Sequence, residues 1–297
     1  MKTHLEAKSR GHRRDTRAGY TLVELMMASA IGSATIAGVL TMSIQQRSYH
    51  EAHREKTEIR QNVTYAIDSV SHDIRMAGYG LDVPSIELSS WINWIPGFTS
   101  NPKINDGANG QPAKVFIAAA FDQPVAELVS GITTGDTAMT VCSLDGSALP
   151  LNVVQNRVLF LGKTETIRIT NVSGSGTNAT LSISRDPVAI QGVQFEYPAG
   201  TPIELVKVIE YERIAAGVSS TPYPYLTRRD TSVPTQFRGL WDVSAAYIDD
   251  FQVSQSSGEY LILVTGIASK RDKDYVDPIH SDHYRRLTAT ATVTRRN

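Results

Sequence analysis

The sequence predicts an α+β protein in which a long N-terminal helix precedes an antiparallel β domain. Three observations support this fold class. Residues 20–44 contain a single charged side chain, Glu24. Residues 47–77 repeat apolar side chains every three or four positions, which is typical of an amphipathic helix. From Lys114 onward, short stretches of alternating polar and apolar residues lie between turn residues, which is the pattern of β-strands.

The apolar segment 20–44 is predicted to span a membrane. At about 25 residues it would form a helix of about 38 Å, which is enough to cross a bilayer. A secretory signal peptide would have a shorter apolar region that ends in a small-residue cleavage site. Here the segment continues into further helical sequence, and the first proline is Pro84. We therefore expect a retained helix, with any cleavage before the apolar segment.

Residues 45–80 are predicted to form the amphipathic half of the same helix. The apolar stripe consists of Ile59, Val63, Ala66 with Ile67, Val70, Ile74 and Ala77. The helix should end near Ala77, because glycines at 78 and 80 and a proline at 84 are C-terminal signals. One helix from Tyr20 to Ala77 would be roughly 85 Å long. We expect its first half to lie in lipid or in a bundle of like helices, and its second half to pack on a globular domain.

That domain should comprise residues 81–297 and be rich in strands. Residues 81–112 are rich in Pro, Gly, Asn and Ser and are predicted to be a long loop, which Trp91, Trp94 and Phe98 pin to the body. The short strands within 131–200 are expected to form a small β subdomain. The predicted strands are Val115–Ala120, Ala138–Cys142, Val158–Leu161, Thr166–Val172, Leu181–Ser184, Glu204–Arg213, Tyr225–Arg228, Ile248–Val253, Tyr260–Ala268 and Leu287–Thr294.

Charge and cysteine content restrict the location and the partners. Residues 1–19 carry six basic and two acidic side chains, a net charge of +4, so the remainder carries −5 of the total of −1. A basic flank stays on the cytoplasmic side of a membrane span, so the domain after residue 44 should be exported to the periplasm. The mildly acidic body predicts no nucleic-acid partner. Cys142 is the only cysteine, which excludes an intramolecular disulfide, and we expect it to be a buried strand residue.

The order of a basic leader, Gly19, and Tyr20-Thr-Leu-Val-Glu24 resembles the prepilin signal of type IV pilins and of the pseudopilins of type II secretion. The resemblance implies that residues 1–19 are a leader, cut between Gly19 and Tyr20 by a prepilin peptidase that also N-methylates Tyr20. The family more often has Phe where this chain has Tyr20. The resemblance further implies that Glu24 pairs with the terminal amine of a neighbouring subunit during assembly.

Physical reasoning agrees with such a role for Glu24. A lone carboxylate costs about 3 kcal/mol at the middle of a bilayer, and less near the interface. Cleavage after Gly19 would create an ammonium group on Tyr20, and the Glu24 of an adjacent helix could neutralise it. Because the pair forms at one axial offset of two helices, it would set their register.

Further segments resemble PilW-type minor pilins: residues 61–68 and 73–80 at the helix end, and Trp241–Val253 in a late strand. The closing residues 292–297 also suit the J-type minor pseudopilins. The resemblance implies a minor pilin, without a reaction of its own, that initiates the assembly of a type IV pilus or forms its tip. Its partners would be other minor pilins, the major pilin and the inner-membrane assembly platform. The alternatives are a minor pseudopilin of type II secretion, or a membrane-anchored periplasmic enzyme or ligand-binding protein.

The remaining motifs give weak candidates for metal or catalytic sites. Asp272, Asp274 and Asp277 could bind Ca²⁺ from one loop, but an EF-hand's glycine and distal Glu are missing, so a solvated hairpin loop is favoured. His280, Asp282 and His283 could bind a transition metal but lack an evident further ligand. No cofactor is therefore predicted. No nucleophile elbow, H-E-x-x-H motif or dinucleotide fingerprint occurs, and we expect no enzyme.

Overall fold

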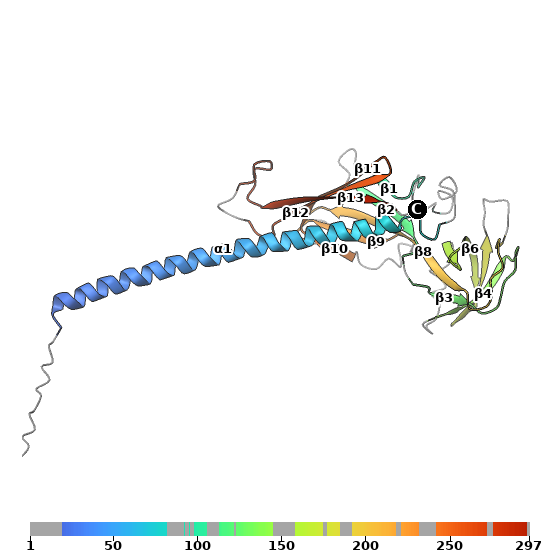
Figure 1. Ribbon diagram of the computed structural model, residues 1–297, viewed down its shortest axis with the longest axis horizontal. Helices are drawn as coiled ribbons and strands as arrows, with labels where there is room; N and C mark the ends of the chain where they lie inside the picture. Colours follow the sequence, from blue (N-terminus) through green and yellow to red (C-terminus); the bar gives the residue numbers. More distant parts are fainter. Residues whose placement is uncertain are drawn as a thin grey trace, which may run out of the picture. The chain divides into compact units, whose positions relative to one another are not determined.

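The computed structural model describes residues 20–81, 92, 95, 98–105, 113–121, 123–144, 158–174, 177–184, 192–217, 221–231, 242–271 and 276–295. The described chain begins with a helix, α1 (Leu22–Met76), and continues in antiparallel strands (Figure 1). This architecture confirms the prediction of an α+β protein with a long N-terminal helix. The chain divides into two compact units, Met1–Arg54 and Glu55–Asn297, so α1 contributes to both.

The strands form two sheets within the second unit. Their bounds are β1 (Lys103–Asn105), β2 (Lys114–Ala119), β3 (Ala126–Leu128), β4 (Ala138–Ser143), β5 (Val158–Leu161), β6 (Glu165–Ser173), β7 (Asn178–Ser184), β8 (Pro202–Ile214), β9 (Tyr225–Asp230), β10 (Asp242–Ala246), β11 (Ile248–Ser256), β12 (Glu259–Ile267) and β13 (Arg286–Thr294). Every predicted strand overlaps one of these. The strands that were not predicted are β1 and β3, each of three residues, and β10.

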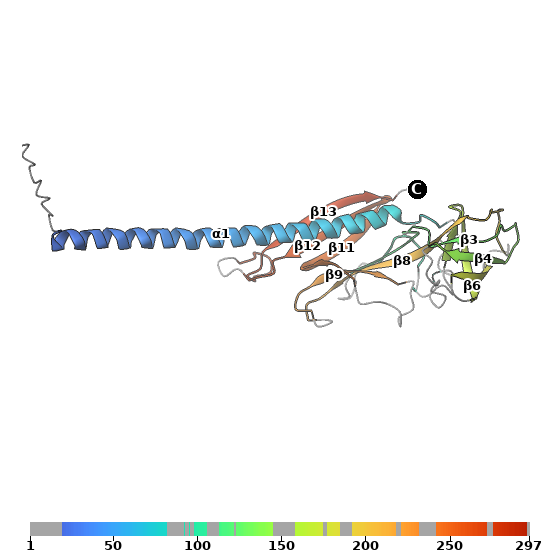
Figure 2. The ribbon, with the colours of Figure 1, turned by 90° about the horizontal axis from the view of Figure 1, so that it is seen from below.

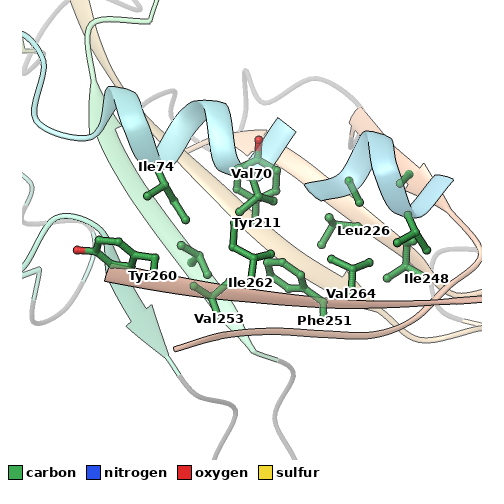
Figure 3. Packing of buried hydrophobic residues seen from close by; sticks show 14 of the residues in the cluster. Val70, Ile74, Tyr211, Leu226, Ile248, Phe251, Val253, Tyr260, Ile262 and Val264 are labelled. Atoms are coloured by element: carbon green, nitrogen blue, oxygen red, sulfur yellow. The ribbon is translucent and has the colours of Figure 1, made fainter. Parts of the chain in front are cut away.

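The predicted apolar stripe of α1 packs against both sheets. Ile59, Val63 and Val70 are at most 4% exposed. They share a hydrophobic cluster with residues of β2, β8, β9 and β10 and with the three-stranded sheet β11–β12–β13 (Figure 3). The approach to β12 is close, because a Cβ on Gly266 would lie 2.6 Å from Val63 Cγ2 and 2.7 Å from Ile59 Cγ2. Glycine at this strand position therefore lets the helix lie directly on the sheet.

The helix ends where the glycines predict. Gly78 has a φ of 87° and Gly80 a φ of 78°, the left-handed region that glycine occupies without strain. The backbone N–H of Gly78 donates to Ala118 O at 2.9 Å, and the N–H of Ala120 donates to Tyr79 O at 2.9 Å. The chain leaving α1 is therefore joined at once to the end of β2.

A closed barrel occupies one end of the larger sheet (Figures 1 and 2). Its antiparallel pairings run β8–β3–β4–β7–β6–β5 and return to β8, so each of these strands has two neighbours. The barrel encloses its own hydrophobic cluster, which includes Leu161, Ile167 and Ile169. The predicted subdomain at 131–200 lies within this barrel, which also needs β3 and the start of β8 to close.

Strand β8 belongs to both parts of the larger sheet. Its first residues, through Val206, pair with β3 and β5 of the barrel. Its later residues, from Lys207, pair with β2 and β9, and these two strands pack against α1. The core of the barrel and the core beneath α1 are thus connected by one continuous strand.

The segment 81–112 departs from the predicted loop, because it contains β1. Phe98 is fully buried, with Ile92 and Ile95, against Phe116 of β2 and Val208 of β8. A pinning role for Phe98 agrees with this placement, whereas Trp91 and Trp94 lie outside the described residues. Cys142 lies in β4 as expected but is only half-buried, and its thiol donates to Glu127 Oε1 at 3.6 Å. Burial raises the pKa of this thiol, which keeps it protonated.

Candidate functional site

The N-terminal turn of α1 holds the predicted assembly residue, Glu24. Thr21 caps the helix: its carbonyl accepts the N–H of Leu25 at 3.1 Å, and its hydroxyl accepts the backbone N–H of Glu24 at 3.2 Å. The pair Thr21 and Glu24 has the spacing of a capping box. Because the bond uses the backbone of Glu24, its carboxylate remains available, and it has no partner among residues 20–81 or the other described parts of the chain.

A carboxylate in the first turn also has a local electrostatic benefit. The N-terminus of a helix carries a partial positive charge, which favours a negative side chain there by about 0.3–1 kcal/mol. Glu24 and Tyr20 are both exposed, Tyr20 by 86%. The geometry therefore presents Glu24 at the start of the apolar helix, where it can neutralise a cation of another molecule. Gly19, the predicted cleavage residue, lies outside the described residues.

The apolar half of α1 exposes its large side chains on all sides. They include Leu25 at 67%, Ile36 at 62% and Ile44 at 67% exposure. An exposed apolar surface of this size is typical of a segment that contacts lipid or another protein. The helix is long and apolar enough to cross a membrane, and its most apolar stretch is not buried by other parts of the structure. This supports the predicted membrane span.

Four hydroxyl groups of this half donate hydrogen bonds to carbonyl groups of the helix itself. Ser29 donates to Met26 O, Ser33 to Ala30 O, Thr35 to Ile31 O and Thr41 to Ala37 O, each at 2.9 Å. Water is absent from the bilayer core, so a polar group there needs a protein partner. These bonds therefore remove a cost that four hydroxyls would otherwise bring to a lipid-facing helix.

Three of the predicted metal ligands, Asp277, His280 and Asp282, have partners within the protein. Asp272 and Asp274 lie outside the described residues. Asp277 Oδ1 accepts the backbone N–H groups of Ile279 and His280, both at 2.9 Å, and lies 3.0 Å from His280 Nδ1. Among the described residues, no group of three or more potential ligands is placed to hold a metal ion.

Arg286 connects the carboxylates at this end of the domain, and its role was not predicted. Its guanidinium donates to Asp249 at 2.6 Å and to both oxygens of Asp282 at 2.8 and 2.7 Å, and lies 3.5 Å from Asp277. The hydrogen bonds from Arg286 hold the pKa of Asp282 at about 2. Asp277 and Asp282 thus fasten the loop before β13 to β11, which is a structural role.

A second unpredicted cluster lies between α1 and the sheet. The hydroxyl of Tyr211 donates to Asp73 Oδ2 at 2.7 Å and lies 2.8 Å from the hydroxyl of Ser69. Arg228 Nε donates to the same Asp73 oxygen at 2.9 Å. Asp73 is 2% exposed, so its charge is compensated inside the protein. The sequence feature that could have indicated this cluster is the position of Asp73, a charged residue directly beside Ile74 of the apolar stripe.

Comparison with known proteins gave no assignment of family. No protein-family model, curated protein or solved structure matched this chain.

Proposed function

We propose that this chain is a minor type IV pilin of the PilW type, which a prepilin peptidase processes between Gly19 and Tyr20. The observation that carries the proposal is the exposed apolar half of α1, which begins with the uncommitted carboxylate of Glu24. The same helix continues into an amphipathic half that packs on a β domain. A membrane anchor alone needs only the apolar half of α1, whereas a subunit that moves from a membrane into a filament also uses the carboxylate at its start.

In the proposed mechanism, Glu24 neutralises the N-methylated amine of Tyr20 on a neighbouring pilin. Two charges that would each be costly in an apolar surrounding then compensate one another. The pair favours one axial offset between helices and so directs this subunit into a complex with other minor pilins and the major pilin. The inner-membrane platform would receive that complex to start a pilus or build its tip.

The state of the N-terminus tests the processing step. We expect mass spectrometry of the protein purified from membranes to show a chain that begins with methylated Tyr20. A chain that retains residues 1–19 would contradict the proposal and favour a membrane-anchored enzyme or ligand-binding protein.

Glu24→Gln tests the assembly step. This change keeps the Thr21 cap, which uses the backbone of residue 24, and removes only the charge. We expect the variant to stay in the membrane and be processed, while its co-purification with other pilins falls at least about tenfold, or about 1.4 kcal/mol. Glu51→Gln, at an exposed position of the same helix, is the matched control and should co-purify normally. Normal assembly of Glu24→Gln would remove the proposed role.

A further inference from the structure

The free edges of the sheets differ in how they are protected against pairing with another chain. Natural edge strands are commonly short, charged or bulged, because an open row of N–H and C=O groups can pair with any extended segment. β1 has three residues, and β10 has a register irregularity between Val243 and Ala245. β11 has an irregularity between Ile248 and Asp250 and carries two adjacent aspartates there.

After its first residue, Arg286, β13 has none of these protections. It has nine residues, and its register with β12 runs without interruption from Arg286 to Thr294. After Arg286 its sequence is Leu-Thr-Ala-Thr-Ala-Thr-Val-Thr, without charge, proline or glycine. In the described part of the chain β13 pairs only with β12, and Figure 2 shows it at the outer margin of its sheet.

The hydrophobic core is also incomplete along this edge. Leu287 and Ala289 of β13, with Ile67 of α1, are only partly buried at the border of the cluster beneath the helix. At the opposite edge of the same sheet, Ile248 and Phe251 of β11 are 0% and 2% exposed. An additional strand beside β13 would cover the partly buried side chains, whereas the apolar side chains of β11 are already buried.

The charged residues at the two ends of β13 determine which kind of strand can pair with its open edge. Arg285 precedes the strand and Arg295 follows it. Arg295 is exposed, donates to the Asn101 carbonyl at 3.2 Å, and has no carboxylate partner among the described residues. Two copies of β13 paired antiparallel would place these arginines against one another, and like charges directly opposite are destabilising. A strand that carries a carboxylate beside Arg295 would instead complement that charge.

We propose that the open edge of β13 binds an extended strand of a different protein by β-augmentation. The bound strand is uncharged along its length, alternates small or β-branched side chains, and carries a carboxylate where it passes Arg295. Main-chain hydrogen bonds supply the affinity, and the alternate side chains supply the selectivity. The proposal depends on the β domain alone, so it stands or fails separately from the pilin assignment.

A designed peptide tests this interaction with the whole chain in detergent. The probe has the length of β13, alternates Thr and Val, and has Asp at both ends. We expect it to bind in fluorescence anisotropy and to slow hydrogen exchange in residues 286–294 but not in β11. The same peptide with alternate N-methylated amides cannot donate those hydrogen bonds and should bind at least about tenfold more weakly.

A charge exchange tests the selectivity. Arg295→Glu should weaken binding of the Asp-ended peptide about fivefold and improve binding of a Lys-ended peptide, as expected for a partly exposed charge pair. Lys163→Glu, in the turn between β5 and β6, makes the same charge change away from the edge and should alter neither. Absence of slowed exchange in β13 at millimolar peptide, or equal binding by the N-methylated peptide, would overturn the proposal. So would self-association of the chain through β13, which would assign this edge to a second copy.

Discussion

At the scale of single residues, buried charges hold the helix and the last loop in place. Asp73 has its charge compensated by Arg228 and by the hydroxyl of Tyr211, which Ser69 also contacts. Burial is the largest cause that raises the pKa of Tyr211 well above its ordinary value, and the charge of Asp73 is the second. Tyr211 therefore remains a hydrogen-bond donor at every physiological pH.

Tyr211→Phe should lower the free energy of unfolding of the β domain. The change removes one hydroxyl and leaves the buried Asp73 with one donor fewer, and hydrogen bonds to charged groups contribute about 1.5–3 kcal/mol. Urea unfolding followed by circular dichroism would measure the loss. Tyr65→Phe, at an exposed tyrosine of α1, is the control and should change stability by less than about 0.5 kcal/mol. Equal stability of the two variants would contradict the role of the Asp73 cluster.

The loop before β13 should lose stability in acid. The pKa of Asp282 is held at about 2, below its ordinary 3.8, by Arg286, and that of Asp277 is lowered mainly by the backbone N–H of His280. A lowered pKa gives stability that is complete above the ordinary value and declines as pH falls from 3.8 toward 2. The protection of residues 276–286 against hydrogen exchange, measured relative to the intrinsic rate at each pH, should therefore fall over that range.

Asp282→Asn provides the comparison. Its loop should already be less protected against exchange than the parent at pH 6, and it should lose less further protection between pH 4 and pH 2. Asp68→Asn, at an exposed carboxylate on α1, should retain the acid dependence of the parent. If Asp282→Asn behaved like the parent at every pH, the contacts with Arg286 would contribute nothing to the loop.

At the scale of elements, the close contact of α1 with β12 depends on one glycine. A Cβ at Gly266 would lie 2.6 Å and 2.7 Å from the methyl groups of Val63 and Ile59. Gly266→Ala should therefore force the helix from the sheet and cost about 1–3 kcal/mol of stability. Gly38→Ala is the control, since nothing lies within 4 Å of a Cβ there. Urea unfolding of both variants would measure the difference, and equal midpoints would show that the contact relaxes without cost.

At the scale of the whole molecule, the two halves of α1 should differ in their response to charge. Ile36 and Tyr65 lie on the same helix and are 62% and 61% exposed. Ile36→Arg should reduce membrane retention, because arginine at the centre of a span costs about 2.5–3.5 kcal/mol. Tyr65→Arg should leave retention unchanged. Resistance of each variant to alkaline carbonate extraction is the measurement, and equal retention would contradict a span centred near Ile36.

The sequence determined the elements whose signals are local. The uncharged run, the apolar repeat and the glycines at 78 and 80 predicted the long helix and its end, because each follows from the properties of neighbouring residues. Alternation likewise predicted most strands. The position of Glu24 in an apolar run is evident from the sequence, whereas the capping of the helix by Thr21 is shown only by the structure.

Only the tertiary structure decided which distant residues meet. β3 is too short to show alternation, so closure of the barrel through β8 could not be read from the sequence. The compensation of Asp73 by Arg228 and the capture of Asp282 by Arg286 depend on strand register. The open edge of β13 depends on which strand is last in its sheet. Each of these is a long-range pairing, and local residue patterns carry no information on pairing between distant segments.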